Sequence, residues 1–375
     1  MVGKKHKQKA NSEDKRKLII AESLILLVVA VVAALKLSAP KAPELSEPPL
    51  KDLAAMHGVA LGNSVSFGNL TNKIYTNILT SQYNTFIIDG EGNWAYFDGI
   101  LRPSPTKFNY TNTDKLVDFA KDHEMPIRFQ HLVWGEAHWL PKWLKNGNYS
   151  QQQLLSLIHN HISNLVGHYK GQIRTYTVVN EAFTRSQHID GLQDWWADHI
   201  GNTGYIDDSF IWAHQADLKA TLLLNDFDNE IENSVSDSEY NYVKTALVRG
   251  VPIEGIGMQM HIDAASPPNK EDVIKNIRRF AKLGLPVYIT EFDVNFNKVN
   301  GSAVFKNQLQ AQIAYNMVRA CIESKDCLSF GQLHVADYHM RFNSLHPYKP
   351  HSYLFTTKYQ PKPAFYSFRQ AWQQP

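Results

Sequence analysis

Two glutamates, Glu181 and Glu291, each follow an apolar run, and they stand 110 residues apart. The runs cover residues 178–180 and 287–290. A carboxylate at this place is either a surface residue at a strand end, as most glutamates are, or a group that takes part in chemistry. If both strands belong to one barrel, the two carboxylates can flank a single bond. Retaining glycoside hydrolysis uses such a pair, with the carboxyl groups about 5–5.5 Å apart.

Three polar residues could assist Glu291 in catalysis. Asp293 follows two positions later on the same side of the strand, and an earlier run ends in Gln259-Met260-His261, which puts Gln259 and His261 on one face. A histidine between two carboxylates can donate a proton to one and be held by the other. That arrangement keeps Glu291 ionised, as a nucleophile requires. Taken alone, His261 fits a buried structural histidine equally well.

Glu181 suits the complementary role of acid/base. Asn180 directly precedes it, and an amide there can hydrogen-bond a sugar hydroxyl next to the reacting carbon. An acid/base must be protonated before the nucleophile attacks, and it accepts a proton once the glycosyl-enzyme has formed.

The order of elements along the chain predicts how these residues come together. Eight runs read as strands: 58–62, 83–88, 125–133, 173–180, 220–224, 255–260, 286–290 and 328–335. Amphipathic segments with helical spacing, such as 152–168 and 270–283, lie between them. The alternation predicts an α/β fold, a (β/α)8 TIM barrel. A doubly wound open sheet is the alternative, although no Gly-rich phosphate turn follows an early strand.

The N-terminal region differs from the rest in charge and hydropathy. Residues 1–17 carry seven Lys and Arg against two acidic residues, a net +5 in a chain of net +2, so the remainder carries −3. This balance argues against a nucleic-acid partner for the folded part. We interpret 1–17 as a basic cytoplasmic head, 18–37 as a membrane segment, 38–50 as a Pro-rich linker and 51–375 as the catalytic barrel.

The 20 residues 18–37 are apolar except for a few positions near their ends. Basic residues before such a segment keep the N-terminus in the cytoplasm. We therefore expect a single-pass signal-anchor with the barrel outside the cytoplasm. A cleaved signal peptide with secretion of the barrel is the alternative, and a buried or surface helix is a third.

The chain has two cysteines, Cys321 and Cys327, with five residues between them. A lone pair is a poor metal site, because zinc requires four ligands and no second cluster exists. In an exported domain a small-loop disulfide is favoured, and two buried free thiols are the alternative. We expect neither a metal nor a cofactor.

Several segments in the correct order resemble glycoside hydrolase family 10, the endo-β-1,4-xylanase family. They are residues 169–173 with 178–182, 224–227, 255–261, 288–293 and 360–366, and the two cysteines fall where many members carry a disulfide. The resemblance covers about residues 55–372. It implies that Glu181 is the acid/base and Glu291 the nucleophile. Asn180, Gln259, His261 and Asp293 would support them.

The segments that hold the sugar depart from the family pattern. In residues 89–94 Trp94 is retained, but Gly90 replaces an Asn and Asn93 replaces a Lys. In residues 130–135 both family histidines are missing from their usual places. The resemblance implies a substrate-binding set on these two segments: Asp89, Asn93, Trp94, Gln130 and Trp134.

The resemblance implies retaining, endo-acting hydrolysis of β-1,4-glycosidic bonds in a xylan-like or related plant or wall polysaccharide, by a protein that acts as a monomer. The altered segments favour a substrate other than plain xylan, such as a decorated or different β-glycan. The opposing alternative is a catalytically decayed carbohydrate-binding barrel tethered to a membrane. A different hydrolase on the same barrel is a third interpretation.

Overall fold

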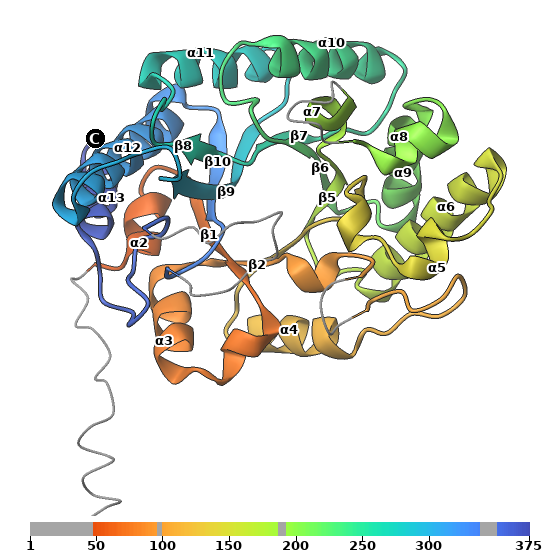
Figure 1. Cartoon of the computed structure of the whole chain (residues 1–375), viewed down its shortest axis with the longest axis horizontal. Helices are drawn as coiled ribbons and strands as arrows, with labels where there is room; N and C mark the ends of the chain where they lie inside the picture. Colours follow the sequence, from red (N-terminus) through yellow and green to blue (C-terminus); the bar gives the residue numbers. More distant parts are fainter. Residues whose placement is uncertain (1–47, 96–99, 187–192, 338–350) are drawn as a thin grey trace, which may run out of the picture. The chain divides into compact units, whose positions relative to one another are not determined.

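The computed structural model describes residues 48–95, 100–186, 193–337 and 351–375. Parallel strands form a closed barrel (Figure 1). In order around the barrel they are β1 (Ala60–Val65), β2 (Thr85–Ile88), β3 (Ile127–Phe129), β5 (Thr175–Asn180), β6 (Thr221–Asp226), β7 (Gly255–Met258), β9 (Val287–Asn295) and β10 (Cys327–Gln332). Strand β10 pairs with both β9 and β1, which closes the ring. The predicted (β/α)8 barrel is confirmed.

Helices surround this barrel (Figure 1). The longer ones are α3 (Lys73–Gln82), α4 (Thr111–Asp122), α6 (Gln151–His168), α9 (Gly204–Ala216), α10 (Ser234–Val248), α11 (Lys270–Ala281), α12 (Ala303–Ser324) and α13 (Pro363–Gln373). Short helices lie in the connections: α2 (Leu50–Ala55), α5 (Lys142–Lys145), α7 (Ala182–Ser186), α8 (Trp195–Ile200), and the 3-10 turns η1 (Phe67–Thr71), η2 (Gly90–Gly92) and η3 (Ala137–Trp139).

Local sequence explains where the predicted helices begin. Ser150 and Gln153 form a capping box at the start of α6, which satisfies backbone N–H groups that have no partner within the helix. Asn269 accepts a hydrogen bond from the backbone N–H of Glu271 and caps α11 in a similar way. Both helices bury the apolar residues whose spacing predicted them.

Two of the predicted strands differ from the observed ones at the end that carries the site. The run 125–133 divides into β3 and the two-residue strand β4 (Val133–Trp134), both of which pair with β5. Strand β9 does not stop before Glu291 but continues to Asn295, where it pairs with the short strand β8 (His261–Asp263). The barrel is deep enough here to bury charged side chains, so a carboxylate does not mark the end of the strand.

A disulfide joins Cys321 near the end of α12 to Cys327 at the start of β10. This finding confirms the predicted bridge and excludes the alternative of two free thiols. The bridge lies at the amino end of β10. The glutamates lie at the carboxyl ends of the strands, so it is far from them along the barrel axis.

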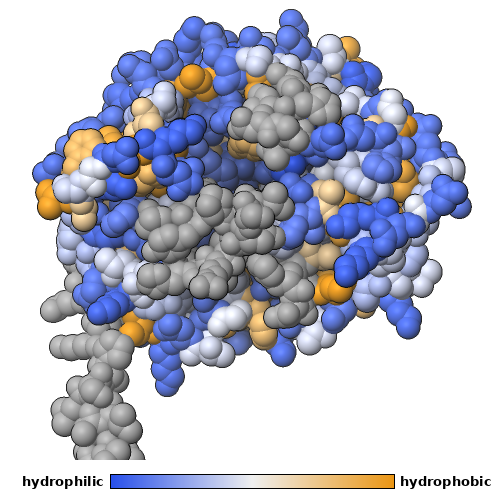
Figure 2. Space-filling model, in the orientation of Figure 1, coloured by the Kyte–Doolittle hydropathy of each residue, from blue (hydrophilic) through white to orange (hydrophobic). Residues whose placement is uncertain are grey.

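The predicted membrane segment, residues 18–37, and the basic head before it lie outside the described residues, as does most of the linker 38–50. Within the described ranges, no helix combines the length and apolar character needed to cross a membrane. The face of the barrel domain seen in Figure 2 is largely hydrophilic and is hollowed near its centre.

Candidate active site

Strand ends bring the predicted residues together at one rim of the barrel. Asn180 ends β5 and Glu181 follows at once, while Gln259 follows β7. Glu291 and Asp293 lie within β9, and His261 begins β8 beside Asp293. All these strands are parallel, so their carboxyl ends meet at the same edge. In this architecture that edge is where catalytic groups are found.

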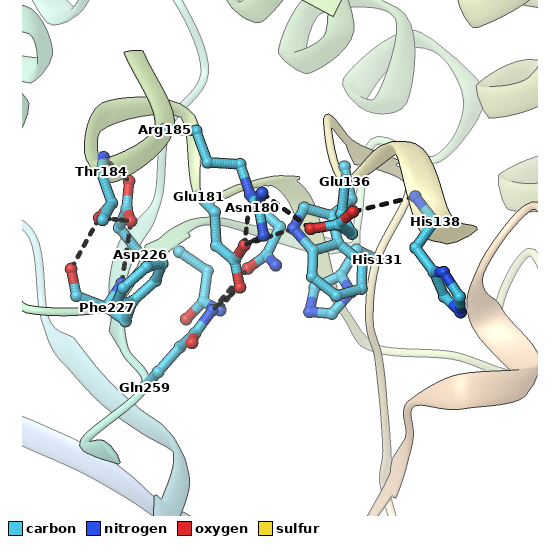
Figure 3. Close-up of polar contacts among 12 residues, drawn as sticks. His131, Glu136, His138, Asn180, Glu181, Thr184, Arg185, Asp226, Phe227 and Gln259 are labelled. Carbon is cyan, nitrogen blue, oxygen red and sulfur yellow. Dashed lines mark hydrogen bonds and ion pairs between the residues drawn. The ribbon is translucent and has the colours of Figure 1, made fainter. Parts of the chain in front are cut away.

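Three donors hold the carboxylate of Glu181 (Figure 3). Its Oε2 accepts hydrogen bonds from Trp134 Nε1 and Arg185 Nε, each at 2.6 Å. Its Oε1 accepts a hydrogen bond from Gln259 Nε2 at 3.0 Å. The side chain is buried, with 7% of the residue exposed. Its position and orientation are therefore fixed before any substrate binds.

The backbone at Glu181 has a φ of +58°, in the left-handed region that side chains other than glycine seldom occupy. Asp226 stabilises the turn that follows. It accepts hydrogen bonds from the backbone N–H groups of Phe183, at 2.7 Å, and Thr184, at 3.2 Å, and a further one from the Thr184 hydroxyl (Figure 3). Strained residues of this kind cluster at functional sites, where neighbouring structure holds them.

Buried amides connect the two glutamates. Asn180 Oδ1 accepts hydrogen bonds from Gln259 Nε2, at 3.2 Å, and Asn225 Nδ2, at 2.7 Å. Asn225 Nδ2 also donates to Glu291 Oε1 at 3.2 Å. The amide Nδ2 of Asn180 is buried and has no hydrogen-bond partner among the described residues.

Glycine at position 257 makes room for this network. A Cβ there would lie 2.0 Å from Asn225 Oδ1, so any larger residue would displace the asparagine that connects the glutamates. Strand β7 therefore requires a glycine here, because the side chain of Asn225 on the neighbouring strand β6 occupies the space beside it.

Two imidazoles face Glu291. His131 Nε2 lies 3.7 Å from Oε1, and His261 Nε2 lies 3.5 Å from Oε2. His261 is oriented by Asp293, whose Oδ1 lies 3.1 Å from His261 Nδ1. Burial by itself raises the pKa of Glu291, but the two histidines outweigh that effect and hold the pKa well below its usual range. Glu291 is therefore an anion in the folded protein.

The arrangement has two chemically different halves. Glu291 is a buried carboxylate kept ionised by facing imidazoles, which suits a nucleophile. Glu181 lies on the adjoining part of the rim, held by neutral and cationic donors, and can exchange a proton at its less crowded oxygen. Among the described residues, no group of three or more His, Cys, Asp and Glu side chains could hold a metal ion.

The five predicted substrate-binding residues lie in different environments. Trp134 contacts Glu181 directly, as described above. Asp89 is half-buried after β2; burial and the charge of Glu291 raise its pKa to about 7. Asn93 is buried, with its Oδ1 3.4 Å from His131 Nδ1.

The other two predicted substrate-binding residues are enclosed. Gln130 is buried completely, directly after β3. Trp94 is 2% exposed; it stacks on His161 with ring centroids 4.2 Å apart and donates its indole N–H to the Leu132 carbonyl at 2.9 Å. Trp94 therefore packs against its neighbours in this structure, and its role in sugar binding stays a prediction from the retained sequence pattern.

Four residues of the site were not predicted: His131, Glu136, Arg185 and Asn225. The sequence contains a signal for two of them: Asn225 lies in the segment 224–227 that resembles the family, and His131 lies beside a family position. His131 stands one position after the place where the family has a histidine, and the structure shows that its ring still reaches Glu291. Glu136 and Arg185 form an ion pair of 2.9 Å beside Glu181, and their separation in sequence gave no sign of it.

Comparison with known proteins identifies relatives of this chain. The family model described as "Glycosyl hydrolase family 10" matches residues 49–371. The "Endo-1,4-beta-xylanase B" of Thermotoga neapolitana is 31% identical over 314 residues, which cover 84% of this chain and 87% of that protein. The "Beta-1,4-xylanase" of Dictyoglomus thermophilum is 33% identical over 275 residues, or 72% of this chain and 73% of that one.

Solved structures agree with the sequence relatives. Xylanase 10B from Thermotoga petrophila, determined in complex with xylobiose, superposes with a TM-score of 0.79 at 28% identity. The match covers 88% of this chain and 99% of that one. Native xylanase 10B from Thermotoga maritima gives a TM-score of 0.78 at 29% identity, over 87% of this chain and 98% of that one.

Proposed function

Because the chain belongs to glycosyl hydrolase family 10 and is therefore a glycoside hydrolase, we propose that it cleaves internal β-1,4 bonds of a xylan-like polysaccharide with retention of configuration. Glu291 is the nucleophile and Glu181 the acid/base. The observation that carries this assignment is the contrast between the glutamates. One is kept ionised by two histidines, and the other is held through Oε2 by Trp134 and Arg185.

The reaction proceeds in two displacements. In the first, an oxygen of Glu291 bonds to the anomeric carbon while the bond from that carbon to the leaving oxygen breaks. The electron pair goes to the leaving oxygen, which takes the proton of Glu181. In the second, Glu181 accepts a proton from water, the resulting hydroxyl bonds to the anomeric carbon, and the electron pair returns to Glu291.

Asn180 binds the sugar at the reacting unit. Its buried Nδ2 has no partner among the described residues, and a buried donor without a partner is costly unless a ligand satisfies it. A sugar hydroxyl next to the anomeric carbon is the group that this donor fits. The names of the relatives, and the xylobiose bound in one neighbour, support a xylan-derived substrate.

The test is release of reducing sugar from a panel of β-glycans, including xylan, by the wild type, Glu181→Ala and Glu291→Ala. Glu271→Gln, which alters an exposed carboxylate at the start of α11, is the matched control. We expect hydrolysis of xylan by the wild type and the control, with losses of several orders of magnitude in both site variants. Binding of xylan without turnover by the wild type would contradict the proposal and support the decayed, sugar-binding alternative.

We also propose that residues 18–37 anchor the protein in a membrane, with residues 51–375 as an independently acting, monomeric catalytic barrel outside the cytoplasm. The support is the basic head followed by 20 largely apolar residues and a proline-rich linker. The full chain should sediment with membranes and resist a carbonate wash. Recovery of the protein in the soluble fraction, shortened at its N-terminus after expression of the full chain, would support the cleaved signal peptide instead.

A further inference from the structure

Arg185 bridges two carboxylates beside the reacting centre. Its Nη2 lies 2.6 Å from Glu181 Oε2, and its Nη1 lies 2.9 Å from Glu136 Oε2 (Figure 3). Arg185 is 5% exposed and the Glu136 side chain 19%, so the pair with Glu181 is largely shielded from water and the pair with Glu136 is partly shielded. Burial lowers the pKa of Arg185, but the two carboxylates outweigh burial and raise it, so the guanidinium stays charged.

Local structure fixes all three groups. Arg185 lies on α7, whose start is held by the hydrogen bonds to Asp226, and its guanidinium carbon lies 5.6 Å from the centre of the Trp134 ring. Glu136 caps η3 by accepting a hydrogen bond from the His138 N–H at 2.9 Å. The bridge is therefore part of the folded rim and does not depend on a flexible surface side chain.

The bridge decides which oxygen of Glu181 can carry a proton. The indole N–H of Trp134 and the guanidinium of Arg185 can only donate hydrogen bonds. Both bind Oε2, so a proton on that oxygen would face two donors. The acid proton is consequently confined to Oε1, where Gln259 is the one donor among the described residues.

Charge gives Glu136 a separate task. A cation next to a carboxylate favours its ionised form, so Arg185 alone would oppose the protonated Glu181 that the first displacement needs. With Glu136 included, the three groups sum to zero when Glu181 is protonated and to −1 when it is ionised. Glu136 therefore balances Arg185 and lets Glu181 hold its proton.

We propose that Arg185 and Glu136 are a positioning pair that confines the acid proton to Oε1 of Glu181 and sets the alkaline limit of activity. This inference rests on the proposed function. In the first displacement the Oε1–H bond breaks and its proton passes to the leaving oxygen. In the second, Oε1 accepts a proton from water. Arg185 stabilises the anionic Glu181 present between these steps.

Other titratable groups lie on the elements packed around Glu181, and they are unchanged in the variants below: Asp226 at the end of β6, Glu291 on β9, His131 after β3 and His261 on β8. Any shift caused by substituting Arg185 or Glu136 is therefore measured against the same background.

The primary experiment follows the titration of the Glu181 side-chain carboxyl by 13C NMR in the full chain labelled at glutamate. Loss of the peak in Glu181→Gln assigns it. Glu136→Gln keeps an oxygen to cap η3 but removes the balancing charge, and it should move the titration midpoint to lower pH. Arg185→Met should move it to higher pH, since Glu136 then faces Glu181 without a cation.

Activity provides the second readout. The alkaline limb of the kcat/KM profile with xylohexaose should move to lower pH in Glu136→Gln and to higher pH in Arg185→Met. An aryl glycoside with a nitrophenolate leaving group needs little proton transfer, so its glycosylation rate at neutral pH should change much less. Arg185→Lys should restore part of the wild-type profile. Arg249→Met, at a surface ion pair with Asp207, is the remote control.

The inference is overturned if the folded Glu136→Gln and Arg185→Met variants titrate like the wild type, or if both midpoints move in the same direction. A purely structural role for the pair gives either of those results. If the midpoints move oppositely but xylohexaose is not cleaved, the pair stands and the substrate proposed above is wrong.

Discussion

His131 places its Nε2 3.7 Å from Oε1 of Glu291, although 160 residues separate them in the chain. Together with His261 on the other oxygen, it keeps a carboxylate ionised inside the barrel, where burial alone would favour the neutral acid. The contact could not be predicted from the sequence pattern, in which the histidines of this segment are missing from their usual places.

Substituting His131 by Asn should therefore narrow the active pH range from the acidic side. One of the two imidazoles that lower the pKa of Glu291 is removed, so that pKa rises and more of the proposed nucleophile is protonated at low pH. We expect the acidic limb of the kcat/KM profile to move to higher pH, so that the loss relative to the wild type is greatest at the acidic end of the range. A pH profile of hydrolysis measures it. His123→Asn, on an exposed histidine after α4, is the control.

The substitution Trp134→Phe tests the donor to the proposed acid. It removes the indole N–H that binds Glu181 Oε2 at 2.6 Å while keeping an aromatic ring. A hydrogen bond to a charged group contributes about 1.5–3 kcal/mol, so kcat with xylo-oligosaccharides should fall by about tenfold or more. Trp212→Phe, at a tryptophan whose ring lies tilted against that of His159, should retain full activity. Equal activity of both variants would mean that Trp134 does not position Glu181.

The barrel and the position of both glutamates at one rim could be predicted from the sequence because those signals are local. Each is an apolar run or a residue directly after one. The same reasoning could not predict the contacts that tune them. Arg185 and Glu136 are 49 positions apart, and their pairing depends on how α7 and η3 meet above the rim. The surroundings of Trp94 could not be predicted either, since its place in a family pattern does not reveal that His161 stacks on its ring.

The pH dependence of the free energy of unfolding can test whether the buried carboxyl group of Glu230 is protonated in the folded protein. Burial raises the pKa of Glu230 from the ordinary value of 4.5 to about 7. Between pH 4.5 and about pH 7, Glu230 holds a proton in the folded protein that it has released in the unfolded chain. The stability linked to this group is therefore complete below pH 4.5 and is lost as the pH rises to about 7.

Glu230→Gln should remove that dependence, because a glutamine cannot titrate but can still accept the hydrogen bond of Met260 N–H, at 3.0 Å in the wild type. Denaturant unfolding at pH 5 and pH 7 should show the wild type losing about 1–2 kcal/mol more than the variant over this interval. Glu124→Gln, at an exposed glutamate, should follow the wild type. A Glu230→Gln variant as pH-sensitive as the wild type would disprove the buried, protonated state.

The disulfide should contribute to stability and not to catalysis. Closing the short loop between Cys321 and Cys327 restricts the unfolded chain, which for a loop of this size is worth about 2 kcal/mol. The double substitution of both cysteines by Ser should lower the free energy of unfolding by about that amount and leave kcat unchanged. A reducing agent should reproduce the loss in the wild type and have no effect on the double variant. An equal effect on both proteins would contradict this account.

The central claim is a double displacement in which Glu291 attacks the anomeric carbon. Its most direct test is 1H NMR of the products in the first minutes of xylohexaose hydrolysis, before mutarotation mixes the anomers. The account predicts that the β-anomer appears first and that Glu291→Ala releases none. First appearance of the α-anomer would show inversion and would contradict the role of Glu291 as a nucleophile.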